Sequence, residues 1–332
     1  MALLSKKHPQ RDFFILDLAD VVPKDDTASM EHPIFSLATK PDMRELRYEN
    51  AGHSLRVIPS GHGLATIHDK DILIWAISKI IHEKNLGRPY SRTVEGSAYE
   101  LLTATNRPTS KLAYDRLEAA FIRLSGTRFV TTIKTGGKVT KDIFGMVEKA
   151  SFNYDTETGS MRRDRVKVTL SDWMFRAVDN LEVVTISENY FRLRRPLERR
   201  IYEIARKHCG HNPKWSIGLD LLQKKTGSNA PLKRFRHNLR QIIEDDHTPF
   251  YRIELTDRDV VIFRPRKTVR KIEGAIALPS WAEERARIIA HEKGWDYHAL
   301  EREWMAYARQ EGMPDNPGAA FIGFCKQKPS LR

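Results

Sequence analysis

The chain has 332 residues, of which 40% are hydrophobic and 30% charged, a composition typical of folded globular proteins and unlike that of disordered chains. Its formal net charge of +13 favours a polyanionic partner, with nucleic acid preferred over an anionic membrane surface. No stretch approaches the roughly 18 consecutive apolar residues of a membrane-spanning helix, and the first residues are too polar for a signal peptide. Two cysteines are too few for a disulfide framework or a Cys-rich zinc site. We therefore expect a cytoplasmic protein with no cofactor, no bound metal and no membrane contact.

The N-terminal part of the chain predicts an arm followed by a hairpin and a helix. Residues 1–43 contain scattered acids and prolines with little periodicity, which is typical of a loosely ordered arm. Two extended runs within residues 44–58 flank Asn50 and Gly52, which suit a turn. Residues 69–81 then predict a largely buried helix with Asp69 as its N-cap.

Residues 94–178 predict a helix-turn-helix followed by a β wing. A second helix over 94–103 ends at the breaker Asn106-Arg107-Pro108-Thr109, and a third helix spans 110–125 with an apolar core face. The β-branched run 127–133 and the extended run 138–154 flank Gly136-Gly137 and predict the wing. A further strand over 166–170 leads into a short helix that ends near Val178.

The same order of elements recurs in the second half, and such a duplication restricts the fold sharply. Helices are predicted at 196–208, 217–225 and 231–245, and strands at 250–255 and 260–264 form a second wing. The interval from Leu117 to Phe129 equals that from Leu239 to Tyr251, which agrees with a repeat. Helices at 281–293 and 298–309, with a short apolar piece over 319–325, complete the chain.

The sequence therefore predicts an α+β fold of two tandem winged-helix domains, each a helix-turn-helix plus a β-wing, with a small C-terminal helical appendage. The expected boundaries are a loosely ordered arm at 1–43, a first winged-helix domain at 44–180, a second with a basic linker at 181–272, and a helical region at 273–332.

A winged helix places its third helix in the major groove, and the second copy has suitable chemistry there. Leu232, Phe235, Leu239 and Ile242 mark its buried stripe, so that the opposite face is basic. The predicted DNA-binding residues of this helix are Lys233, Arg234, Arg236, His237 and Arg240. Arginine and lysine suit both guanine edges and phosphates. A basic face that contacts only water is the alternative.

The third helix of the first copy has a mixed outer face. Its candidate DNA contacts are Arg107, Thr109, Ser110, Lys111 and Arg116. Leu112 and Ile122 are also predicted on the outside, where they would suit a protein interface such as a homodimer. Base reading and dimerisation both remain open for this helix.

Three further basic runs lie outside these helices. One contains the candidates Arg192, Arg194 and Arg195 and continues to Arg199 and Arg200. The others lie at 162–167 and 264–271. Each run suits phosphate contact, although ion pairs with nearby acids explain such runs equally well.

Enzyme signatures are absent where they would be expected. The sequence has no G-x-x-x-x-G-K-[ST] phosphate loop and no His-apolar-His pair of the kind that holds the metal in nicking enzymes. The run His208-Cys209-Gly210-His211 has no second ligand pair nearby, so we interpret it as the C-terminus of a helix. We expect a protein that is not an enzyme.

Several ordered segments resemble the replication initiator protein A family of bacterial plasmids. The resemblance covers roughly residues 45–265 and is carried by residues 63–74, 105–109, 123–127, 168–173 and 190–200. It implies sequence-specific binding to repeats in double-stranded DNA at a plasmid origin, initiation of replication and opening of the duplex there. It further implies autorepression, a monomer–homodimer equilibrium, and recruitment of the host replication initiator and replicative helicase. A winged-helix transcription repressor without an origin role is the alternative, and a nickase is a third hypothesis.

Overall fold

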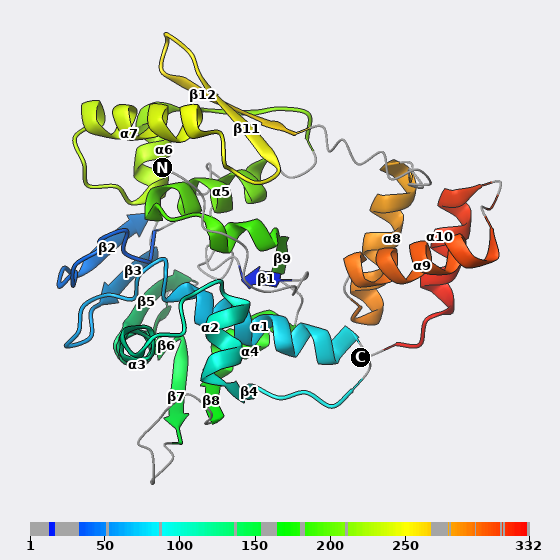
Figure 1. The fold of residues 1–332 in the computed structure, drawn as a ribbon, viewed down its shortest axis with the longest axis horizontal. Helices are drawn as coiled ribbons and strands as arrows, with labels where there is room; N and C mark the ends of the chain where they lie inside the picture. Colours follow the sequence, from blue (N-terminus) through cyan, green and yellow to red (C-terminus); the bar gives the residue numbers. More distant parts are fainter. Residues whose placement is uncertain are drawn as a thin grey trace.

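The computed structural model describes most of the chain (Figure 1). The described residues are 13–16, 33–50, 53–85, 88–135, 138–153, 165–179, 183–209, 212–266, 278, 280–295, 297–312, 314 and 316–330. They form four antiparallel sheets and three groups of helices. Within these residues no helix combines the length and the apolar character needed to span a membrane.

The first half contains a four-stranded sheet in the order β2-β3-β5-β6. Its strands are β2 (Leu46–Asn50), β3 (His53–Ile58), β5 (Arg128–Thr135) and β6 (Lys138–Gly145). The expected hairpin at 44–58 is therefore present, although its turn at 51–52 lies outside the described residues. Phe129 of β5 pairs with Val57 and Phe144, so that the apolar residues of three strands share one face.

The first half also contains a three-stranded sheet in the order β4-β8-β7 and most of its helices. The strands are β4 (Thr93–Ser97), β7 (Val147–Phe152) and β8 (Arg165–Leu170). The helices are α1 (Lys70–Asn85), α2 (Ala98–Ala104), α3 (Lys111–Gly126) and α4 (Asp172–Asp179). Helix α1 is buried along nearly its whole length, as its broad apolar face predicts.

The second half contains two small sheets and three α-helices. Strand β9 (Val183–Ile186) pairs with β1 (Phe13–Leu16), and the 3-10 helix η2 (Glu188–Arg192) follows β9. The helices are α5 (Pro196–His208), α6 (Leu219–Thr226) and α7 (Leu232–Asp245). Strands β10 (Trp215–Gly218), β11 (Tyr251–Leu255) and β12 (Val260–Pro265) form a sheet in the order β10-β12-β11.

The two halves share one order of elements. The first half runs α1–β4–α2–α3–β7–β8 and the second runs α5–β10–α6–α7–β11–β12. In both, the last strand of the unit lies between the other two in a three-stranded sheet. Strands β5 and β6 interrupt the first unit and pair instead with the β2–β3 hairpin.

The first two strands expected for the wing of the first copy do pair as a hairpin, β5 with β6, but they belong to the sheet of β2 and β3 and not to the three-stranded sheet of the repeated unit. Residues 128–135 and 138–145 leave the repeated unit because β5 pairs with β3, and the run 138–154 divides into β6 and β7 at Met146. The strand equivalent to β11 is β7, so the equal spacing of Leu117–Phe129 and Leu239–Tyr251 joins strands that are not equivalent. Both predicted second helices also begin later than expected, because β4 and β10 occupy their first residues.

The N-terminal arm was predicted too long. Phe35, Ser36 and Asp42 are buried, and Ser36 forms a parallel bridge with Thr66 next to α1. The Asp42 carboxylate accepts hydrogen bonds from Ser36 Oγ (2.7 Å) and from the backbone and side chain of Arg44. These bonds and the burial of Phe35 fix residues 33–44 against the first half, whereas residues 1–12 and 17–32 lie outside the described part.

Two hydrophobic cores are present among the described residues. One continuous core runs from Phe35 to Phe263 and spans both repeated units. A separate core belongs to α8 (Ser280–Lys293), α9 (Tyr297–Glu311) and α10 (Pro317–Gln327). These three helices form the expected C-terminal helical region (Figure 1).

A buried ionic network joins the two repeated units. Asp71, in the first turn of α1, accepts from Arg199 of α5 (2.7 Å) and from Arg107 (3.0 Å). Beside it, Lys70 Nζ lies 3.0 Å from Glu203 Oε2, and Glu203 Oε1 accepts from Tyr190 Oη at 2.7 Å. Charges this deeply buried are tolerated only when they are paired and hydrogen-bonded, so the network constrains how α1 and α5 pack.

Candidate nucleic-acid interface

Helix α7 has one apolar face and one basic face. Phe235, Leu239 and Ile242 are buried against the second unit, at the three- and four-residue spacing of a helix that packs on one side. Leu232, which the sequence also predicted to be buried, is 37% exposed because it is the first residue of the helix. On the opposite face Lys233, His237 and Arg240 are exposed, as predicted from the sequence, and Arg234 is exposed on one flank. His237 Nε2 lies 3.1 Å from Gln241 Nε2, one turn along the same face. Four of the five residues predicted on this helix therefore point to solvent.

The fifth predicted residue, Arg236, has a partner in the turn between β11 and β12. Its Nε and Nη2 donate to the two carboxylate oxygens of Asp259 at 3.0 and 2.5 Å. This bidentate bond lowers the pKa of Asp259, and the positive charge of Arg240 lowers it further. The same bond raises the pKa of Arg236. The side chain of Arg236 is consequently tied to the turn and is not free on the helix face.

A turn centred on Gly227 positions the start of α7. Gly227 is the C-cap of α6 and has φ +74°, a left-handed conformation that glycine adopts without steric cost. An added Cβ would lie 2.6 Å from Cβ of Pro33, so the close approach of residues 33–44 also requires glycine. Gln223 Nε2 donates to the carbonyl of Ala230 across the turn. The helix-turn-helix angle is thus set by contacts within the second unit and with Pro33.

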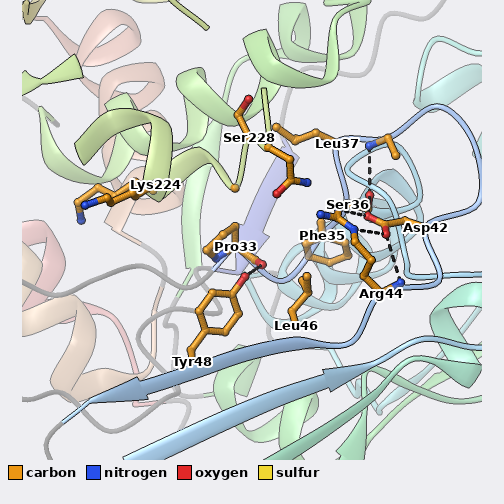
Figure 2. A pocket seen from close by; sticks show the side chains of 14 residues that line it. Pro33, Phe35, Ser36, Leu37, Asp42, Arg44, Leu46, Tyr48, Lys224 and Ser228 are labelled. Carbon is orange, nitrogen blue, oxygen red and sulfur yellow. Dashed lines mark hydrogen bonds and ion pairs between the residues drawn. The ribbon is translucent and has the colours of Figure 1, made fainter. Parts of the chain in front are cut away.

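A pocket of about 540 Å³ lies beside this turn (Figure 2). Lys224 and Ser228 line it on the side of the second unit, and the Arg44–Asp42 pair lies on the side of the first. Burial raises the pKa of the Tyr48 phenol to about 12, and its Oη donates to the carbonyl of Pro33 at 2.7 Å. Exposed Lys224, which lines the pocket, therefore lies near the turn that precedes α7.

The run that contains Arg192, Arg194 and Arg195 is divided among different environments. Arg192 Nη1 donates to Asn189 Oδ1 at 3.1 Å, whereas Arg194 is exposed. Arg195, at the N-cap position of α5, pairs with Asp245 at the end of α7 (2.7 Å). Arg199, further along the same run, is buried against Asp71. The run therefore acts largely in packing, and Arg194 is its residue that faces solvent most openly.

Helix α3 presents the mixed outer face that its sequence predicts. Ser110, Lys111 and Arg116 are exposed, and Thr109 is half-buried just before the helix. Leu112 and Ile122 on the same helix are 56% and 40% exposed. The face thus offers both cations and apolar groups.

Arg107 does not lie with the other candidates of the first unit. Its Nη2 is 3.0 Å from Asp71 Oδ2 and donates to the carbonyl of His68. Burial lowers the pKa of the nearby His68 to about 4. Arg107 therefore belongs to the network at the start of α1, which the sequence does not reveal because Asp71 lies 36 residues earlier.

Sequence reasoning missed two exposed cations on the β11–β12 hairpin. Arg252 alternates with buried Tyr251 and Ile253 along β11, and Arg258 lies in the turn. The alternation of polar and apolar residues along β11 was the available signal. Because β11 packs against α7, the hairpin that carries these two arginines lies next to the helix.

The chain is similar to known proteins over most of this arrangement. The model of the family described as replication initiator protein A matches residues 24–253. A "Putative replication protein" of Wigglesworthia glossinidia brevipalpis is 34% identical over 267 residues, which covers 79% of this chain and 96% of the relative.

Solved structures show the same fold at much lower sequence identity. A crystal structure of domains 2 and 3 of RctB superposes with a TM-score of 0.52 at 12% identity, covering 70% of this chain and 95% of that one. A selenomethionine derivative of the same two domains gives a TM-score of 0.53 with 94% of its chain covered.

Fold and matches together define a DNA replication initiator of mixed α/β architecture. The chain belongs to the replication initiator protein A family, whose model matches residues 24–253. Its role is accordingly in the initiation of replication.

Proposed function

We propose that the protein binds repeats in double-stranded DNA sequence-specifically at a plasmid replication origin, through two winged-helix units. The observation that carries the proposal is the outer face of α7, where Lys233, Arg234, His237 and Arg240 are exposed on the second helix of a helix-turn-helix. The net charge of +13 supports a nucleic-acid partner over a neutral one.

In this proposal α7 enters the major groove with its exposed basic face towards the bases. Lys233 and Arg240 contact base edges, where an arginine that pairs with guanine discriminates by roughly 1–3 kcal/mol. Arg252 and Arg258 of the hairpin contact phosphates, which position the helix without reading sequence. Arg194 and Lys224, which are both exposed, add further phosphate contacts.

Helix α3 gives the first unit a second function in the proposal. Ser110, Lys111 and Arg116 contact DNA when the protein binds as a monomer. Exposed Leu112 and Ile122 favour the competing assignment, in which this face joins two copies in a homodimer that represses its own promoter.

In this proposal the protein acts in the bacterial cytoplasm and catalyses no reaction itself. It binds the origin repeats, helps to open the duplex, and brings the host replication initiator and replicative helicase to the site. No phosphate loop is present in the sequence, which supports a role that does not depend on nucleotide hydrolysis.

A footprint on the DNA that carries its gene, repeated at several salt concentrations, tests the proposal. Protection of phased direct repeats, with affinity that falls steeply as salt rises, is the expected result. Protection of a promoter palindrome alone would favour a transcription repressor without an origin role. Loss of sequence-selective protection at every salt concentration would overturn the proposal, and metal-dependent cleavage of supercoiled origin DNA would show a nickase instead.

A further inference from the structure

The turn between β11 and β12 places an acid beside the basic face of α7. Asp259 has φ +55°, and its N–H donates to the carbonyl of Thr256 at 3.1 Å. Its own carbonyl accepts from Leu219 N–H at 2.8 Å, at the first residue of α6. The residue is therefore held to both the turn and the helix-turn-helix.

The carboxylate of Asp259 is bonded to Arg236 and is also partly exposed to solvent. It accepts both hydrogen bonds from Arg236, yet its side chain keeps 43% of its surface exposed, whereas that of Arg236 keeps 28%. Arg240 lies one helical turn beyond Arg236 on α7, and its positive charge also lowers the pKa of this carboxylate. An acid at this position thus faces any polyanion that approaches α7 from the hairpin side.

We propose that Asp259 is a specificity-determining residue of the interface described under Proposed function, on which this inference rests: its carboxylate holds Arg236 away from phosphates and keeps Arg240 oriented for base contact. Asp259 acts through these two arginines and is therefore a positioning residue.

Loss of the Asp259 carboxylate would release Arg236 and would leave Arg240 less well oriented. These two effects act differently on nonspecific DNA and on origin DNA. An arginine released from Asp259 gains a phosphate contact, which every sequence supplies, and so strengthens nonspecific binding. An Arg240 that has lost its neighbouring charge is less well oriented before binding, which weakens only complexes that use its base contact. Specificity is a difference of affinities, and a repulsive group that penalises the wrong partner increases it.

The matched substitutions Asp259→Asn and Asp257→Asn test the inference. Both remove one negative charge from the same turn, but Asp257 is exposed and makes no ion pair within the described part of the chain. Asparagine tolerates a left-handed backbone, so Asp259→Asn keeps the turn. The measurements are dissociation constants for an origin fragment and for a shuffled duplex, each over a series of salt concentrations.

Asp259→Asn is expected to strengthen binding to the shuffled duplex about two- to five-fold, as loss of a surface charge pair allows, without strengthening binding to the origin. The slope of log affinity against log salt for the shuffled duplex should steepen by about 0.9, the value for one added phosphate contact. Asp257→Asn should change both duplexes equally. The added substitution Arg236→Ala should abolish the gain of Asp259→Asn.

Equal changes on both duplexes for Asp259→Asn would overturn the inference, as would a gain that persists without Arg236. Failure of the proposed function has a different signature, because wild-type protein would then bind the two duplexes equally. That result would remove the basis of the inference together with the proposal.

Discussion

Asp71 of α1 and Arg199 of α5 form a buried ion pair at 2.7 Å between residues that are 128 positions apart in the chain. The pair links the first helix of one repeated unit to the first helix of the other. Arg107 completes the arrangement on the second oxygen of Asp71. A carboxylate shared by the buried Arg199 and the half-buried Arg107 thus links both units through a single side chain.

We predict that Asp71→Asn strongly destabilises the protein. Removing one partner of a buried pair leaves the others unpaired, which costs roughly 3–5 kcal/mol in the free energy of unfolding. Urea unfolding measures this loss, and Asp115→Asn on the exposed face of α3 is the control, with an expected change within about 0.5 kcal/mol. Similar unfolding midpoints for the two variants would contradict the structural role of Asp71.

The buried Glu198, near the start of α5, should make the free energy of unfolding depend on pH. Burial raises its pKa to about 7, and within the described part of the chain Oε1 has no hydrogen-bond partner. Between pH 4.5 and 7 the folded state holds a proton that the unfolded state has lost, so this group's stabilising contribution is lost as pH rises.

The substitution Glu198→Gln should remove the loss of stability that occurs as pH rises. We expect the variant to be more stable than the wild type at pH 8 by about 2 kcal/mol, since each pKa unit corresponds to about 1.4 kcal/mol and part of the shift is screened by solvent. The difference should nearly vanish at pH 4. Unfolding by urea at both pH values measures it, and an equal difference at pH 4 and pH 8 would assign the effect to packing.

Local sequence signals predicted the helices well. Pro196 at the first position of α5 and the buried stripe of α7 gave both helices nearly their observed bounds, because a fixed φ and a 3.6-residue period act within a few residues. Strand pairing was harder. Strand β5 pairs with the next strand β6, as a wing would, but also with β3, some seventy residues earlier, and nothing in the local pattern of 128–135 reveals this second pairing.

In the candidate site, too, local features could be predicted from the sequence and tertiary contacts could not. Exposure of Lys233, His237 and Arg240 follows from helical periodicity, so the sequence was sufficient to predict it. The partners of Arg107, Arg195 and Arg236 could not be predicted, because an ion pair depends on tertiary distances that the chain's local pattern does not contain. Isolated charge runs consequently overestimate the number of free cations.

Arg240→Ala and Lys233→Ala should each weaken binding to origin DNA. Loss of one base contact is expected to cost about 1–3 kcal/mol, and affinity for a shuffled duplex should change less. Both side chains are exposed, so unfolding should be unaffected. Arg285→Ala, on the exposed surface of α8, serves as a control for the lost charge. Unchanged origin affinity of both α7 variants, with intact folding, would contradict the assignment of this face.

Gly227→Ala should disturb the angle between α6 and α7. An alanine with φ +74° is strained, and its Cβ would lie 2.6 Å from Pro33, so we expect a loss of roughly 1–3 kcal/mol in the free energy of unfolding. Gly61→Ala is the matched control, because an added Cβ there meets no atom within 4 Å.

The same substitution separates positioning from stability in the DNA interface. Under conditions in which Gly227→Ala is fully folded, weaker binding to origin DNA would show that the turn at Gly227 orients α7. Equal binding by Gly227→Ala and Gly61→Ala would show that α7 keeps its orientation when the turn is altered. In that case the close approach of Pro33 to Gly227 would contribute to folding alone.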